Sequence, residues 1–152
     1  MNSEILKDCK IQVKGIYDHF DASHDWQHIE RVMANAKLLM KSEAADPMIV
    51  ELAVLLHDVS DPKYKKEGEE LESEILASLE LTDKQKDAIQ AVIQSVSFSG
   101  GNGIAADTVE ARIVQDADRL DALGAIGIAR TFSYGGAKDR KLYDWQEEPR
   151  TQ

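Results

Sequence analysis

A histidine and an aspartate stand side by side at the end of an apolar run, where His57 and Asp58 follow the stretch 50–56. Neutral imidazole and ionised carboxylate are both good ligands for divalent cations, and burying either one unpaired costs several kcal/mol. The doublet alone fits either a metal site or a satisfied core histidine followed by a loop aspartate. A metal site requires further ligands elsewhere in the chain.

Three further carboxylates interrupt the apolar stretch 113–123, at Asp116, Asp118 and Asp121. Solvated helix faces do not usually carry acids among aliphatic residues in this way. At about 100° per residue, positions 118 and 121 share one helix face, whereas position 116 is turned about 200° from 118. We therefore expect Asp118 and Asp121 to point inward, toward a shared site.

Two more histidines, His24 and His28, lie four positions apart, and Asp25 completes a His-Asp-x-x-His sequence close to the His-Glu-x-x-His pattern of zinc proteases. In that interpretation both histidines would share a helix face and bind zinc. However, aspartate is one methylene shorter than the glutamate that must reach a zinc-bound water, and a protease would leave the 57–58 doublet without a role. Taken alone, either histidine could also be structural.

The elements that must position these residues all follow a helical period. Apolar residues recur at three and four positions, no convincing β alternation occurs, and the sequence therefore predicts an all-α bundle of about five to six helices. The third helix is apolar nearly all round, as a central helix would be, and side chains at 21–23 are expected to cap the second. The predicted helices cover 2–20, 23–42, 46–58, 71–79, 82–96 and 108–134.

Length and charge set broader limits. A chain of 152 residues corresponds to about one domain, and its single cysteine, Cys9, excludes an internal disulfide. A net charge of −10 opposes binding to a nucleic-acid polymer, although it does not exclude a small anionic substrate in a locally cationic cleft. No leader sequence or membrane-length apolar stretch is present, so we expect no membrane association and a cytoplasmic location.

Together the motifs resemble the H…HD…D pattern of HD-domain metal-dependent phosphohydrolases. The pattern falls on 28–32, on the 57–58 doublet and on 117–120, and longer similarities to a bacterial subgroup run over 24–28, 57–64 and 116–136. The resemblance covers about residues 20 to 145 and implies an HD-domain helical bundle. We expect an HD phosphohydrolase domain over 1–136 and a polar C-terminal tail over 137–152.

The resemblance also implies roles for individual residues. The family's four metal ligands fall on His28, His57, Asp58 and Asp118. Two imidazoles and two carboxylates leave up to two open positions on an octahedral ion, which favours Mn²⁺, with Mg²⁺, Fe²⁺ or Co²⁺ as alternatives, over a closed zinc site.

Around these ligands the resemblance implies residues for water and substrate. Asp61 would orient water or accept its proton, and Lys63 would stabilise charge that develops on the phosphate. Independently of the resemblance, we expect Arg31 to hold a carboxylate behind the ligands, because metal ligands need such support. The implied substrate-binding residues are His24, Lys63, Arg119 and Asp121.

The implied substrate is a small phosphorylated molecule. The subgroup resemblance favours a nucleoside or deoxynucleoside triphosphate, hydrolysed by water to the monophosphate and pyrophosphate. Alternatives are other HD phosphohydrolase activities, on nucleoside monophosphates, guanosine tetraphosphate or cyclic nucleotides, or a non-catalytic domain that binds metal or nucleotide.

The chain departs from the subgroup at two places. The subgroup has a lysine in the loop after the fifth helix, where this chain reads Ser-Phe-Ser-Gly-Gly over 97–101. The family also continues into further C-terminal helices beyond those this sequence supplies. We therefore expect an uncovered apolar face, which could be buried in a homodimer.

Overall fold

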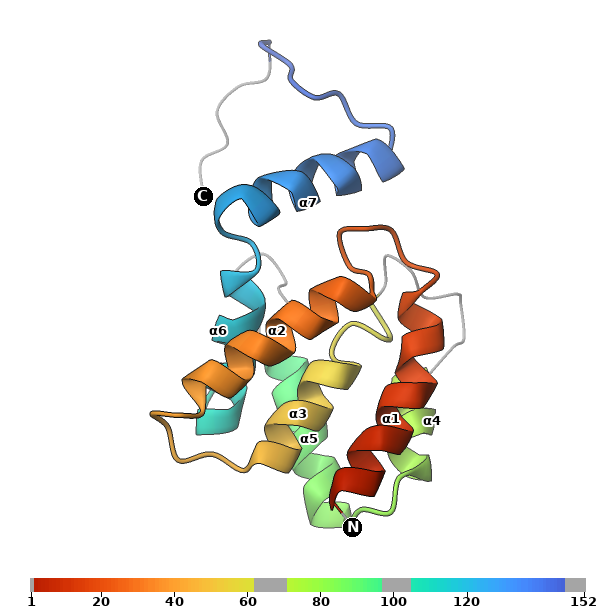
Figure 1. Cartoon of the computed structure of the whole chain (residues 1–152), viewed down its shortest axis with the longest axis vertical. Helices are drawn as coiled ribbons and strands as arrows, with labels where there is room; N and C mark the ends of the chain where they lie inside the picture. Colours follow the sequence, from red (N-terminus) through yellow and green to blue (C-terminus); the bar gives the residue numbers. More distant parts are fainter. Residues whose placement is uncertain (1, 62–70, 97–104, 147–152) are drawn as a thin grey trace.

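The structure is a computed structural model that describes residues 2–61, 71–96 and 105–146. Within these ranges the chain forms α-helices and no strand, which confirms the all-α prediction, with seven helices instead of five to six (Figure 1). The helices are α1 (Asn2–Tyr17), α2 (Trp26–Leu39), α3 (Pro47–Leu56), α4 (Leu71–Ser78), α5 (Asp83–Val96), α6 (Val109–Leu120) and α7 (Gly124–Ala137).

Helix α3 is the centre of the bundle, as its continuous apolar sequence predicts. It packs against α1, α2, α5 and α6, and its Leu52, Val54 and Leu56 side chains are fully buried (Figure 1). The helix begins where the sequence indicates, because the Asp46 side chain accepts a hydrogen bond from the Met48 N–H and proline occupies the first turn. The residues that follow α3 therefore emerge in the interior of the protein.

Helix α2 begins later than predicted. Its N-cap is Asp25, whose carboxylate accepts a hydrogen bond from the His28 N–H at 3.1 Å. The expectation that residues 21–23 cap this helix is wrong, because Asp21 instead accepts hydrogen bonds from the backbone and hydroxyl of Ser23 in a separate turn. His24 thus precedes the helix and does not share a helix face with His28.

The predicted last helix is two helices. Helix α6 ends at Leu120, and α7 starts at Gly124, whose φ of 64° lies in the left-handed region that favours glycine. Gly127 permits the close approach of α7 to the connecting turn, since a Cβ there would lie 2.0 Å from the Ala122 carbonyl oxygen. Helix α7 also continues through both glycines at 135–136, where the sequence pattern predicted its end.

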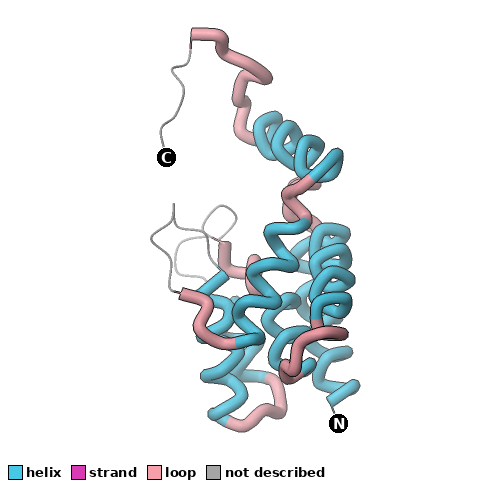
Figure 2. Tube along the Cα trace, turned by 90° about the vertical axis from the view of Figure 1, so that its left-hand side faces the viewer, coloured by secondary structure: helices cyan, strands magenta, loops and turns pink. Residues whose placement is uncertain are grey.

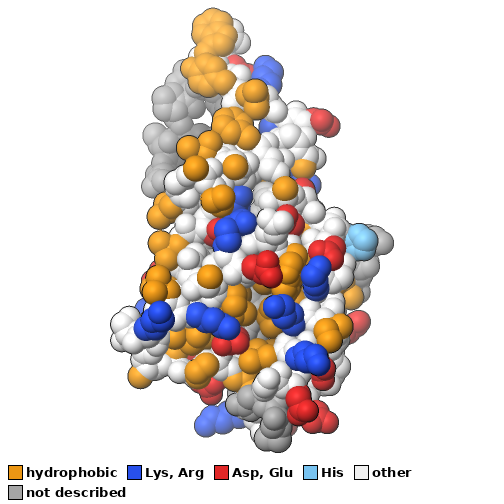
Figure 3. All heavy atoms as spheres, viewed as in Figure 1, with side chains coloured by type: hydrophobic (Ala, Val, Ile, Leu, Met, Phe, Trp, Pro, Cys, Tyr) orange, Lys and Arg blue, Asp and Glu red, His pale blue; other side chains and the backbone are white. Residues whose placement is uncertain are grey.

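Helix α7 lies at one end of the bundle, connected to it through the short turn after α6 (Figures 1 and 2). Its outer side chains and the segment after it carry an apolar surface that is visible at the top of Figure 3. The sequence predicts an uncovered apolar face on the core, whereas part of this surface lies in the segment after α7, which it predicts to be polar. The exposed large side chains are Leu123, Ile126, Ile128, Phe132, Leu142, Tyr143 and Trp145. Among the described helices, none has the length and apolar character required to cross a bilayer.

Candidate metal centre

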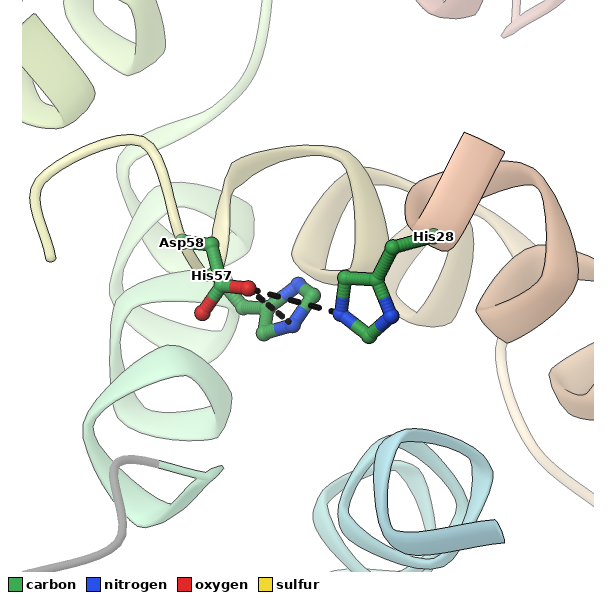
Figure 4. A group of neighbouring side chains, drawn as sticks. All are labelled: His28, His57 and Asp58. Carbon is green, nitrogen blue, oxygen red and sulfur yellow. Dashed lines mark ion pairs between the residues drawn. The ribbon is translucent and has the colours of Figure 1, made fainter. Parts of the chain in front are cut away.

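Three of the predicted ligands meet at the end of α3. One ligand atom from each of His28, His57 and Asp58 can be chosen so that all lie within 4.8 Å of one another. The Asp58 Oδ2 atom is 3.4 Å from His28 Nε2 and 3.3 Å from His57 Nε2, so that one carboxylate faces both rings (Figure 4). His28 reaches this point from the first turn of α2.

Asp118, the fourth predicted ligand, lies on α6. Its Oδ1 atom is 3.4 Å from His28 Nε2 and 3.7 Å from His57 Nε2. Asp116 is exposed, as the helical spacing predicts. Asp118 is outside the group of three whose ligand atoms lie within 4.8 Å of one another, but its carboxylate approaches both Nε2 atoms of that group.

The remaining ring nitrogens fix how both histidines present themselves. His57 Nδ1 is 2.9 Å from the Val54 carbonyl oxygen, and His28 Nδ1 is 2.7 Å from Asp121 Oδ2. Because a carbonyl and a carboxylate only accept hydrogen bonds, both Nδ1 atoms carry the proton, which leaves Nε2 available as the ligand atom. Both Nε2 atoms are buried without a hydrogen-bond partner. Such a pair facing two carboxylates fits a bound cation.

The pKa values of the site residues also fit a bound cation. Burial lowers the pKa of His28, but the neighbouring carboxylates of Asp118, Asp121 and Asp58 outweigh it and raise that pKa to about 10. For His57 the effect of burial is outweighed by Asp58 and Asp118, which raise the pKa to about 9.

The carboxylates respond in the opposite sense. Burial raises the pKa of Asp58, but His57 and His28 lower it to about 2, and the same two rings hold the pKa of Asp118 well below its usual range. Both carboxylates are anions at neutral pH, and a divalent cation would take the place of the imidazole protons.

Asp121 lies behind His28. It is nearly fully buried, and besides His28 Nδ1 it contacts Arg31, with Nε 2.6 Å from Oδ1, and Arg130, with Nη1 3.2 Å from Oδ2. Burial raises the pKa of Asp121, but the hydrogen bonds from His28 and Arg31 lower it to about 2. The resemblance implies that Asp121 binds substrate. In the structure its described contacts are with His28, a predicted metal ligand, and with two arginines. Arg31 holds a carboxylate behind the ligands, as expected.

His24 stands beside the ligand group. Its Nδ1 atom is 2.6 Å from the Ser23 hydroxyl, and its ring centroid is 5.8 Å from that of His28 and 6.1 Å from that of Tyr134. The zinc-protease interpretation finds no support in this arrangement, since the Asp25 carboxylate caps α2 and His24 is not in the group of ligand atoms. His24 is placed where a pocket residue would be.

The structure describes two of the other predicted site residues, Asp61 and Arg119. Asp61 is partly exposed one turn after the doublet, and its backbone N–H donates to the Asp58 carbonyl at 3.1 Å. Arg119 is exposed on α6 beside Asp118. Lys63 and the 97–101 segment lie outside the described residues.

Sequence reasoning missed one set of residues. A cleft of about 350 Å³ opens beside His24 and is lined in part by Arg130, Arg140 and Lys141. The signal available in the sequence was the recurrence of basic residues in and after α7, in an otherwise acidic chain.

Comparison with known proteins identifies the family. The model of the HD domain matches residues 25–123, a range that contains the four predicted ligands. The chain belongs to the HD-domain phosphohydrolase superfamily. It is 38% identical over 136 residues to the uncharacterized protein YpgQ of Bacillus subtilis (strain 168), a match that takes in 86% of this chain and 66% of YpgQ.

Solved structures of similar proteins share the fold. A protein from Lactobacillus plantarum has a TM-score of 0.85 at 33% identity, over 97% of this chain and 70% of that one. An HD-superfamily hydrolase from Bacillus thuringiensis has a TM-score of 0.71 at 39% identity, over 98% and 74%. YpgQ, solved in complex with ADP, has a TM-score of 0.74 at 32% identity, over 94% and 71%. The chain thus spans slightly less than two thirds of YpgQ's full length by sequence comparison.

Proposed function

We propose that this HD-domain protein is a metal-dependent phosphohydrolase that converts nucleoside or deoxynucleoside triphosphates to monophosphate and pyrophosphate. The observation that carries the proposal is the pair of buried Nε2 atoms of His28 and His57, which lack hydrogen-bond partners and face the carboxylates of Asp58 and Asp118. A closed structural site would leave no room for substrate, whereas this donor set leaves up to two positions on an octahedral ion.

The donor set suits Mn²⁺, with Mg²⁺, Fe²⁺ or Co²⁺ as alternatives, because it mixes imidazole nitrogen with carboxylate oxygen and contains no thiolate. When bound, such an ion supplies Lewis acidity toward a phosphoryl oxygen and makes water more acidic. His28 and His57 are held in the tautomer that presents Nε2, so the protein would spend no free energy on reorienting them when the ion binds.

Other residues of the chain would act on water and substrate. Asp61, one turn beyond the doublet, is proposed to orient the attacking water or accept its proton. Lys63 and Arg119 are proposed to contact the phosphate and offset its developing charge. His24, next to the His28 ring, is proposed to line the substrate pocket.

A nucleotide is the proposed substrate class because the sequence motifs resemble a subgroup of nucleotide pyrophosphohydrolases. The complex of YpgQ with ADP supports nucleotide binding in a related protein. The competing proposal is a non-catalytic domain that binds a metal ion or a nucleotide and hydrolyses no substrate.

A substrate panel tests the proposal. The protein would be stripped with a chelator, reloaded separately with each of the four ions and incubated with nucleoside triphosphates, monophosphates, guanosine tetraphosphate and cyclic nucleotides, with products resolved by chromatography. We expect the wild-type protein to convert triphosphates to monophosphate and pyrophosphate. The Asp58→Ala variant should form neither product. Asp116→Ala, an exposed aspartate on the same helix as Asp118, is the matched control. Metal content without turnover of any nucleotide would favour the binding-only alternative.

A further inference from the structure

The cleft beside His24 is separate from the ligand group but adjoins it. It lies between α7, the turn at 23–24 and the segment that follows α7, and has a volume of about 350 Å³. The residues that matter here are His24, Arg130, Tyr134, Arg140 and Lys141. The His24 ring, which lines the cleft, is 5.8 Å from the His28 ring, so the cleft adjoins a predicted metal ligand.

The cleft is cationic in an acidic protein. Three basic side chains line it and none of its described lining residues is acidic, although the whole chain carries a net charge of −10. Carboxylates outside the lining pair with two of the three, Asp121 with Arg130 and Asp144 with Lys141. A local reversal of potential of this kind attracts a small anion without attracting a long polyanion.

A helix C-cap places Arg140 at the cleft. The Arg140 N–H donates to the Gly135 carbonyl at 2.8 Å and the Asp139 N–H to the Gly136 carbonyl at 3.2 Å, with Asp139 at a φ of 52°. These are the two hydrogen bonds of a Schellman motif, which turns the chain back over the last turn of α7. The Arg140 guanidinium consequently lies 5.1 Å from the centroid of the Tyr134 ring.

Arg130 connects the cleft to the metal ligands. Its Nε atom donates to the Ser23 carbonyl at 2.6 Å, and its Nη1 atom lies 3.2 Å from the carboxylate of Asp121, which holds His28. These contacts fix the position of α7 against the turn that carries His24. One side chain, Arg130, therefore lines the cleft and also contacts the carboxylate that holds His28.

We propose that this cleft binds a chain of phosphate groups, and that in the reaction it holds the two phosphates that leave as pyrophosphate. The second part rests on the proposed function. Water oxygen forms a bond to the α-phosphorus, the bond from that phosphorus to the α–β bridging oxygen breaks, and the bridging oxygen leaves with its electron pair on pyrophosphate. One proton of the water passes to solvent through a base, so that atoms and charge balance.

The cations of the cleft suit this ligand. The planar guanidinium of Arg140 matches the geometry of phosphate oxygens better than a point charge does. Lys141 is paired with Asp144 at 3.0 Å, but both groups are solvent-accessible, and such a pair is exchanged for a phosphate contact at little cost. Arg130 already has a structural role, so Arg140 and Lys141 are the residues to vary.

Calorimetry with inorganic pyrophosphate tests the binding directly. The metal-free protein is used, so that only protein groups contribute. We expect Arg140→Ala and Lys141→Ala each to weaken pyrophosphate binding about tenfold, the scale of one lost charge-assisted contact. Lys138→Ala removes the same charge from a side chain that also lies over the Tyr134 ring but does not line the cleft, and it should bind like the wild type. Equal pyrophosphate affinity in wild type and Arg140→Ala would overturn the proposal.

Steady-state kinetics separate this proposal from the proposed function. With a triphosphate and Mn²⁺, Arg140→Ala should raise KM and weaken product inhibition by pyrophosphate about tenfold, while inhibition by the nucleoside monophosphate is unchanged. Equal loss of inhibition by both products would contradict a dedicated phosphate cleft. If the wild type hydrolyses no nucleotide but pyrophosphate binding still depends on Arg140, the proposed function is wrong. The proposal that the cleft binds a chain of phosphates then remains supported.

Discussion

His28 Nδ1 lies 2.7 Å from Asp121 Oδ2, a contact between residues 93 positions apart that joins α2 to the end of α6. The opposite nitrogen of the same ring faces Asp58 and Asp118. Since Arg31 and Arg130 also hold the Asp121 carboxylate, the direction of His28 Nε2 depends on a residue that is not itself a predicted metal ligand.

The first prediction concerns this support. Asp121→Ala removes the acceptor that keeps the His28 proton on Nδ1, and it leaves Arg31 and Arg130 without their shared partner. We expect Mn²⁺ affinity to fall by about 10- to 100-fold, the usual effect of deleting such a partner. Titration against a competing chelator measures this, and circular dichroism checks the fold. Asp116→Ala, exposed on α6, should retain wild-type affinity, and the same result for Asp121→Ala would refute the supporting role.

The second prediction separates ligands from a residue that acts on water. His57→Ala or Asp58→Ala should abolish both metal content and hydrolysis, because each removes a group that faces the shared point. Asp61→Ala should keep the metal and slow turnover by a factor on the order of 10², the scale of acid–base assistance. Metal analysis and product release on the same preparations give both readouts. Full activity of Asp58→Ala would show that the metal-site assignment is wrong.

The third prediction is that protons compete with the metal. In the metal-free protein the pKa values of His28 and His57 are raised to about 10 and about 9, from an ordinary value near 6.5. Metal binding must therefore release protons, and the apparent Mn²⁺ affinity should rise with pH between about 6.5 and 9. The slope is about tenfold per pH unit for each proton displaced. The exposed His19→Ala variant should show the wild-type slope, whereas a flat profile in the wild type would contradict the competition.

The same shifts predict a fourth result, for stability without metal. A histidine whose folded pKa is raised stabilises the fold fully below about 6.5, and this contribution is lost as pH rises through 9 to 10. Asp58 and Asp121, with pKa values lowered to about 2, contribute above about 4 and lose that contribution as pH falls through 2. The free energy of unfolding of chelator-treated protein should thus decline from pH 6.5 to 10, as measured by urea titration. His57→Ala should make this decline smaller. If the free energy of unfolding of the variant fell with pH as steeply as that of the wild type, the decline would not originate in His57.

The sequence predicted the parts of the fold that depend on local signals. Asp46 followed by proline located the start of α3, and the helical angle between positions 116 and 118 separated an exposed carboxylate from one that faces the histidines. The four ligand positions followed from a family resemblance, since their meeting point depends on three helices packing together.

Other features lay beyond the local pattern. The apolar recurrence runs unbroken through 120–126, so periodicity did not reveal the turn between α6 and α7, although Gly124 was available as a signal. Asp25 completes a zinc-protease-like pattern in the sequence, whereas in the structure its carboxylate caps α2. An aspartate that caps a helix cannot be distinguished by its identity from one that serves chemistry. The contact of Arg130 with Asp121 joins two helices across the turn and has no counterpart in the sequence pattern.

The last prediction concerns the turn that directs α7. A Cβ at Gly127 would lie 2.0 Å from the Ala122 carbonyl oxygen, and a backbone atom cannot move aside as a side chain can. Gly127→Ala should therefore destabilise the protein by about 1–3 kcal/mol, as overpacking does, or displace α7 and loosen the contact of Arg130 with Asp121. Gly15→Ala, in α1 with nothing within 4 Å of the added Cβ, should instead stabilise the protein by about 0.5–1 kcal/mol through helix propensity. Thermal unfolding of the two variants compares them directly. If both alanines raised the Tm alike, the close approach of α7 to Ala122 would not exist in solution.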